Sequence, residues 1–158
     1  MEIRRIGPKE REAAVALILR VFMEFEAPDD SPEGVETFQN TVIYHNGYMD
    51  GLVIYGAYEG ETLWGVIATR NEGNHIALFF VDGSRHRQGI GRMLFQRVLT
   101  NSAANEITVN SSPYAVPVYR RLGFVEAAPE QTTGGMRYVP MIYEKGDGRH
   151  RPVKHCQA

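Results

Sequence analysis

The chain has 158 residues, of which 43% are hydrophobic and 23% charged, a composition typical of one globular domain. Its formal net charge of −2 argues against a polycationic nucleic-acid-binding protein, and its one cysteine, Cys156, excludes an internal disulfide and a thiolate zinc site. The sequence shows neither a signal peptide nor an apolar run long enough to cross a membrane, so we expect a cytoplasmic protein without a bound metal.

The first third of the chain predicts a short strand followed by two helices. Residues 1–6 are expected to form the strand, and Pro8 suits the first position of a helix. Residues 9–25 then carry one helical stripe of apolar side chains, at Ala14, Leu17, Ile18, Val21, Phe22 and Phe25. After a break at residues 28–32, residues 33–45 predict a second and weaker helix.

The middle of the chain changes to a strand pattern. Apolar, β-branched and aromatic runs separated by short polar turns predict antiparallel strands joined by hairpins, at residues 52–58, 63–70 and 75–81. Helical spacing returns after Val81, where Ile90, Leu94 and Val98 are four residues apart.

The last part of the chain predicts a short strand at residues 107–110 and a helix at residues 113–122 that Gly123 ends. Residues 125–128 and 137–144 are expected to close the sheet as a hairpin. The element order is strand, two helices, three strands, helix, strand, helix and two strands, which predicts a mixed α/β fold of the α+β type. We expect residues 1–145 to be the folded domain and residues 146–158 to be a flexible basic tail.

A glycine-rich turn at the start of a helix is the most informative local feature. The apolar strand ends at Val81, and Gly89-Ile90-Gly91 opens the next helix, so unpaired backbone N–H groups and the helix dipole favour an anion there. The dinucleotide fingerprint would need a third glycine where Leu94 stands, and a Walker loop would need lysine where Arg92 stands. Neither nucleotide motif is therefore present.

The segment His86-Arg87-Gln88-Gly89-Ile90-Gly91 resembles the acyl-CoA loop of the GNAT superfamily of N-acetyltransferases, although that pattern begins with arginine or glutamine where this chain has His86. Downstream, Asn110 on a strand and the run Tyr119-Arg120-Arg121-Leu122-Gly123-Phe124 also resemble the family. The resemblance covers roughly residues 1–145 and implies a mostly antiparallel, twisted sheet flanked by helices. It also implies acetyl-CoA as the acyl donor.

The resemblance assigns roles to particular residues. Two splayed strands would hold pantetheine between them, and the implied cofactor-binding residues are Phe79, Phe80, Val81, Arg87, Gln88, Gly89, Ile90, Gly91, Arg92, Asn110 and Tyr119. Tyr119 is the expected catalytic residue, because a phenol with an ordinary pKa near 10 is protonated at neutral pH and can donate to the departing thiolate. The alternative for Tyr119 is packing within its helix.

The acceptor side depends on a run of six carboxylates between Glu24 and Glu36 without lysine or arginine, which could attract a cationic amine or could simply be a solvated loop. The residues expected to bind the amine are Phe22, Glu24, Glu26, Asp29 and Glu72. The general base is left open between Glu72, His75 and water.

Three functions compete at this point. The favoured one is transfer of an acetyl group from acetyl-CoA to a small-molecule or peptide amine. The alternatives are a non-catalytic acyl-CoA-binding sensor or interaction module and, with less support, a nucleic-acid-binding domain that uses Arg85, Arg87, Arg92 and Arg97. Residues 137–144 are a candidate edge for a homodimer, by fold analogy alone.

Overall fold

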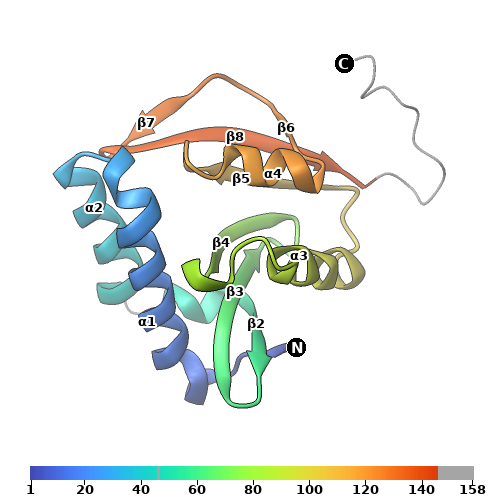
Figure 1. The fold of residues 1–158 in the computed structure, drawn as a ribbon. Helices are drawn as coiled ribbons and strands as arrows, with labels where there is room; N and C mark the ends of the chain where they lie inside the picture. Colours follow the sequence, from blue (N-terminus) through green and yellow to red (C-terminus); the bar gives the residue numbers. More distant parts are fainter. Residues whose placement is uncertain (46, 146–158) are drawn as a thin grey trace.

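The computed structural model describes residues 1–45 and 47–145 (Figure 1). The expected basic tail at residues 146–158 lies outside the described residues. The strands are β1 (Glu2–Arg5), β2 (Val53–Glu59), β3 (Thr62–Arg70), β4 (His75–Val81), β5 (Glu106–Ser111), β6 (Val125–Glu126), β7 (Gln131–Thr133) and β8 (Met136–Glu144). The helices are α1 (Arg11–Val21), α2 (Pro32–Gln39), α3 (Ile90–Asn101) and α4 (Val116–Leu122).

The strands form one sheet in the order β1-β2-β3-β4-β5-β8-β6, and β7 pairs with β8 beside that path. All the pairings are antiparallel except the one between β4 and β5. This arrangement confirms the predicted mixed α/β fold with a mostly antiparallel sheet. The strand β4 begins and ends at the residues that the sequence pattern predicts, His75 and Val81.

Two apolar cores lie on opposite faces of the sheet because the strand side chains alternate. In β3, Val66 and Ala68 belong to the core that α1 and α2 cover, whereas Ile67 belongs to the core that α3 and α4 cover. Figure 1 shows α1 and α2 together on one side of the sheet. The sheet is thereby held between two helical layers.

The parallel contact between β4 and β5 is short. Only His75 and Ile76 of β4 are in register with β5, opposite Thr108 and Val109. Because β5 then pairs with β8 along its whole length, the edge of β4 from residue 77 onward has no β5 partner. The two central strands therefore diverge in the direction of the glycine loop.

The C-terminal strands differ from the expected single hairpin. A third strand, β7, precedes β8, and the turn between them contains Gly134 and Gly135 at φ 59° and 82°. These left-handed conformations suit glycine, and they allow a tight reversal directly before β8. β8 is paired with β5 on one edge over residues 139–144 and with β6 and β7 over parts of the other, which leaves only short stretches of the candidate dimer edge open.

The helix ends also differ from the prediction. α1 continues as a π-helical turn at Phe22–Glu26, α2 continues as another at Asn40–Tyr44, and α4 begins at Val116, three residues later than expected. Wider turns of this kind redirect the side chains that follow them. Among the helices of residues 1–45 and 47–145, none has the length and apolarity that a bilayer span requires.

Candidate active site

The glycine loop owes its shape to two residues in left-handed conformations. Arg87 has φ 66° and Gly89, the N-cap of α3, has φ 84°. Ahead of them, Asp82 caps a short turn by accepting a hydrogen bond from the backbone N–H of Ser84 at 2.9 Å, and His86 Nε2 bonds the Val81 carbonyl at 2.7 Å. The loop therefore ends at the first turn of α3, where the leading amide groups have no partner within the helix.

A cavity of about 400 Å³, which we call the loop cavity, lies between this loop, β4 and α4. Of the residues expected to bind the cofactor, it is lined by Phe79, Phe80, Val81, Arg87, Gly89, Ile90, Gly91, Arg92 and Tyr119. Gln88 is exposed and its side-chain amide donates to the Ser84 carbonyl at 3.5 Å, so it helps to hold the loop rather than to line the cavity. Asn110 lines a second cavity, which adjoins this one at Phe79, Phe80 and Tyr119.

The positive charge of the loop cavity comes from several arginines, of which Arg85 is already paired with a carboxylate. Arg85 forms an ion pair with Glu59 at 2.7 Å and stacks over the Trp64 ring at 4.1 Å. Arg87, Arg92 and Arg121 also line the cavity and give its wall a positive charge suited to phosphate groups.

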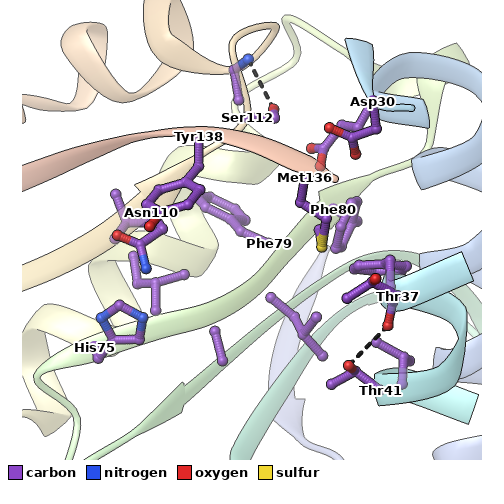
Figure 2. A pocket seen from close by; sticks show the side chains of 18 of the residues that line it. Asp30, Thr37, Thr41, His75, Phe79, Phe80, Asn110, Ser112, Met136 and Tyr138 are labelled. Atoms are coloured by element: carbon purple, nitrogen blue, oxygen red, sulfur yellow. Dashed lines mark hydrogen bonds between the residues drawn. The ribbon is translucent and has the colours of Figure 1, made fainter. Parts of the chain in front are cut away.

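A second cavity, of about 370 Å³, which we call the sheet cavity, lies along β4 and β5 (Figure 2). Its walls come from segments that are far apart in the sequence: the turns that follow α1, α2 and its π-helical extension, the end of β3, β4, β5, α4 and β8. Figure 2 shows Phe79, Phe80 and Met136 in the middle of the cavity, with Asp30 and Ser112 toward one end and His75 toward the other.

The two cavities share five lining residues, which we call the junction: Glu26, Phe79, Phe80, Ala115 and Tyr119. Glu26 reaches this place because it ends the π-helical turn that extends α1. Tyr119 reaches it from the middle of α4, where its ring packs edge-to-face on Phe79 and Phe124 at 5.8 and 5.2 Å. A carboxyl group and a phenol thus lie in the wall between the two cavities.

The junction changes the acidity of both groups. Burial raises the pKa of Glu26 to about 7, with the negative charges of Asp30 and Asp29 adding to the effect and a hydrogen bond to Ser112 opposing it. Burial also raises the pKa of Tyr119 well above its ordinary value, and the neighbouring charge of Glu26 raises it further. Tyr119 is therefore a proton donor at neutral pH, and Glu26 can take up or release a proton there.

Of the residues expected on the acceptor side, Glu26 alone lines the loop cavity or the sheet cavity. Phe22 is completely buried and stacks on Phe38 at 3.9 Å, so the structure gives it a packing role in the core. Glu72 lies in the exposed turn between β3 and β4, and Glu24 is exposed at the end of α1. Asp29 contributes its carbonyl to Arg137 at 3.2 Å rather than a side chain to the cavity.

Sequence reasoning missed several residues of the sheet cavity. Asp30 belongs to the noted carboxylate run, and burial raises its pKa. Arg70, Met136, Arg137 and Tyr138 carry no local signal, because they reach the cavity only when β3 and β8 take their places in the sheet.

An open sheet that diverges beside a helix-opening glycine loop, with two cavities meeting at a buried phenol, is the architecture of an acyltransferase. Residues 26–145 match the family model described as an acetyltransferase (GNAT) domain. The chain therefore belongs to the GNAT family of acetyltransferases, and its class of reaction is acetyl-CoA-dependent acyl transfer.

Solved structures agree in fold. A GCN5-related N-acetyltransferase from Rhodopseudomonas palustris matches with a TM-score of 0.76 at 15% identity, over 90% of this chain and 94% of that one. The PaiA N-acetyltransferase from Thermoplasma acidophilum, solved with coenzyme A, matches with a TM-score of 0.71 at 17% identity, over 90% and 98%. An aminoglycoside 6'-N-acetyltransferase, also solved with coenzyme A, has a TM-score of 0.63 at 11% identity, over 96% and 99%. No curated protein sequence matches the chain significantly.

Proposed function

We propose that this protein is an N-acetyltransferase that transfers the acetyl group of acetyl-CoA directly to a primary amine within a ternary complex. The observation that carries the proposal is the junction, where Glu26 and Tyr119 lie in the wall common to the loop cavity and the sheet cavity. The proposal includes a cytoplasmic enzyme whose folded domain is residues 1–145.

The loop cavity has the chemistry that coenzyme A requires. The N-terminal amides of α3, together with Arg87 and Arg92, would hold the diphosphate. The edge of β4 that β5 leaves free would pair with the amides of pantetheine as an added strand. A side chain at Gly91 would extend toward Phe79, so glycine keeps this wall of the cavity open.

The sheet cavity would then receive the amine at the junction. Glu26 accepts the proton that the amine must lose, and the amine nitrogen forms a bond to the acyl carbon as the bond from that carbon to sulfur breaks. Tyr119 donates its phenolic proton to the departing thiolate. The two groups suit these opposite tasks because burial keeps the phenol protonated while the pKa of Glu26 lies near neutrality.

The test is release of free thiol from acetyl-CoA in the presence of a panel of cationic amines and peptides. Thermal stabilisation by coenzyme A without thiol release on any amine would favour a non-catalytic acyl-CoA sensor instead. If no CoA species stabilises the protein, both the acetyltransferase and the acyl-CoA sensor are excluded.

Replacing Tyr119 with phenylalanine tests the proton donor. We expect turnover to fall on the order of a hundredfold, because that is the contribution of a positioned general acid. Tyr143→Phe is the matched control: it removes a phenol from the same aromatic cluster, where Tyr143 contacts Phe95 and Phe124, but from outside both cavities. Retention of turnover within about twofold in Tyr119→Phe would remove the assignment.

A further inference from the structure

The sheet cavity has carboxylates at one end and a guanidinium at the other. Glu26 and Asp30 line the end that meets the junction, and Figure 2 shows His75 at the opposite end. Arg70 belongs to that opposite end, because it is the register partner of His75 in the pairing of β3 with β4 and also lines the cavity.

Arg70 is the cation of this cavity that has no neutralising partner. Its guanidinium makes no hydrogen bond or ion pair with any of the residues 1–45 and 47–145. Arg137, the other arginine in the cavity wall, is bound by the carboxylate of Glu130 at 2.7 and 3.3 Å and by the carbonyl of Asp29. The free charge at the far end of the cavity is therefore positive and belongs to Arg70.

Other polar groups of the sheet cavity can complete an anion-binding site around Arg70. Tyr48 and Asn110 line the same cavity and carry a hydroxyl and an amide that can donate hydrogen bonds. Arg70 lies near enough to Tyr48 and His75 for its charge to lower the pKa of each, although burial outweighs this for Tyr48 and raises its pKa overall.

His75 offers an acceptor next to this site. Its Nδ1 lies 2.8 Å from the Thr108 hydroxyl, and that hydroxyl donates to the Asn74 carbonyl at 3.3 Å. With the Thr108 hydroxyl donating to that carbonyl, Nδ1 of the neutral ring carries the proton and donates to the hydroxyl, and Nε2 is left as an acceptor for an N–H group. Burial and Arg70 both lower the pKa of His75, so the neutral ring is the form present at pH 7.

The distance between the charged ends sets the length of what can bind. Phe79 at the junction lies four residues after His75 in β4, which corresponds to roughly 13 Å of strand. The wall between is apolar, with Leu78, Phe80 and Met136 exposed to the cavity. An α-amino acid, whose amine and carboxylate share one carbon, cannot reach both ends at once.

We propose that the acceptor is an elongated amino-carboxylate, with its amine at the junction and its carboxylate on Arg70. A short peptide with a free C-terminus meets this description, since it also supplies an N–H group to His75; a long ω-amino acid shares the same two charged ends. This inference rests on the proposed acetyl transfer and names its substrate class.

The test compares kcat/KM for a tripeptide such as Ala-Leu-Ala with that for its C-terminal amide, and does the same for a long ω-amino acid and its amide. We expect the tripeptide acid to be preferred over the amide by about tenfold, with the difference mainly in KM. Arg70→Gln should bring the acid and the amide to within about twofold of each other. Arg5→Gln, which removes an exposed arginine from β1 at the far edge of the sheet, should leave the preference intact.

Equal use of acid and amide by the unmodified enzyme, or a preference that survives Arg70→Gln, would overturn the anion site. A preference shown by the ω-amino acid but not by the tripeptide would keep Arg70 and exclude the peptide. Failure to acetylate any amine would count against the proposed function instead. In that event calorimetric binding of the N-acetylated tripeptide acid and amide, with coenzyme A present, tests Arg70 by itself: equal affinities would again overturn the site.

Discussion

The two cavities that meet at Tyr119 are built in different ways. The loop cavity takes most of its walls from one continuous stretch, the end of β4, the glycine loop and the start of α3, and backbone groups supply much of its chemistry. The sheet cavity takes its walls from many separate segments, and its chemistry lies in side chains such as Glu26, Asp30 and Arg70. One side therefore depends on backbone conformation and the other on tertiary assembly.

This difference separates the two halves of the reaction. Substitutions in α2, β5 or β8 can change what the sheet cavity accepts without altering the left-handed turn that shapes the loop. Only the junction residues belong to both sides, so Glu26 and Tyr119 are where a single change affects donor and acceptor together.

The largest expected effect comes from Glu26→Gln, which removes the proposed base and keeps the shape of the side chain. We expect kcat at pH 8 to fall about a hundredfold, because an amide cannot take the proton from the amine. In the unmodified enzyme, kcat should rise with pH and level off above the Glu26 pKa of about 7; in the variant this rise should disappear. Measurements of kcat for both enzymes at about seven pH values from about 5.5 to 9 check the fall in kcat and the loss of its rise with pH.

Glu24→Gln is the matched control for this experiment. Glu24 precedes Glu26 by two residues, has the same side chain, and is exposed outside both cavities. Its variant should keep the pH profile of the unmodified enzyme. A Glu26→Gln enzyme with an unchanged acid limb would show that another group, such as Asp30 or water, accepts the proton.

The second prediction concerns stability, because a buried carboxylate at the junction opposes folding once it ionises. The pKa of Glu26 is about 7 in the folded protein, against 4.5 for an ordinary glutamate, so the folded state holds a proton that the unfolded state has released. The free energy of unfolding therefore falls as pH rises from 4.5 to about 7, by up to about 3 kcal/mol from this group.

Urea unfolding at about pH 5 and about pH 8, below and above the pKa of Glu26 in the folded protein, measures this contribution. Glu26→Gln should be more stable than the unmodified protein at the higher pH by up to about 3 kcal/mol and close to it at the lower pH. Glu24→Gln should show no such pH-dependent difference. A Glu26→Gln protein with no gain at high pH would mean that the ionised carboxylate is well solvated at the junction.

The sequence predicted the loop side well because its signals are local. The strand at 75–81, the helix that begins after Gly89 and the left-handed Gly123 each follow from neighbouring residues, and the structure confirms all three. Asn110 lines the sheet cavity, because β5 leaves β4 after their short contact and pairs with β8.

The acceptor side was predicted poorly because periodicity cannot show which side of a helix end meets a cavity. Phe22 and Glu26 lie one helical turn apart, yet Phe22 stacks on Phe38 in the core and Glu26 faces the junction after the π-helical turn. Glu72 seemed close to the loop-bearing strand, but its hairpin turn lies at the end of β4 away from the loop. Arg70 was missed because only its pairing with His75 across β3 and β4 reveals it.

The smallest expected effect tests the claim that backbone conformation shapes the loop side. Gly89 has φ 84° and open space where a Cβ would be, so Gly89→Ala should cost about 1 to 2 kcal/mol of stability through conformational strain alone.

Gly91, two residues later inside α3, has an ordinary helical conformation, and a Cβ there would make normal contact with Phe79 at 3.6 Å. Gly91→Ala should therefore be neutral or stabilising by up to about 1 kcal/mol, because alanine favours a helix over glycine. Urea unfolding of the two variants without ligand gives the comparison, and opposite signs are the expected result. Equal effects at the two positions would mean that the loop does not depend on the left-handed N-cap, and the contrast between a backbone-built donor side and a side-chain-built acceptor side would lose its physical basis.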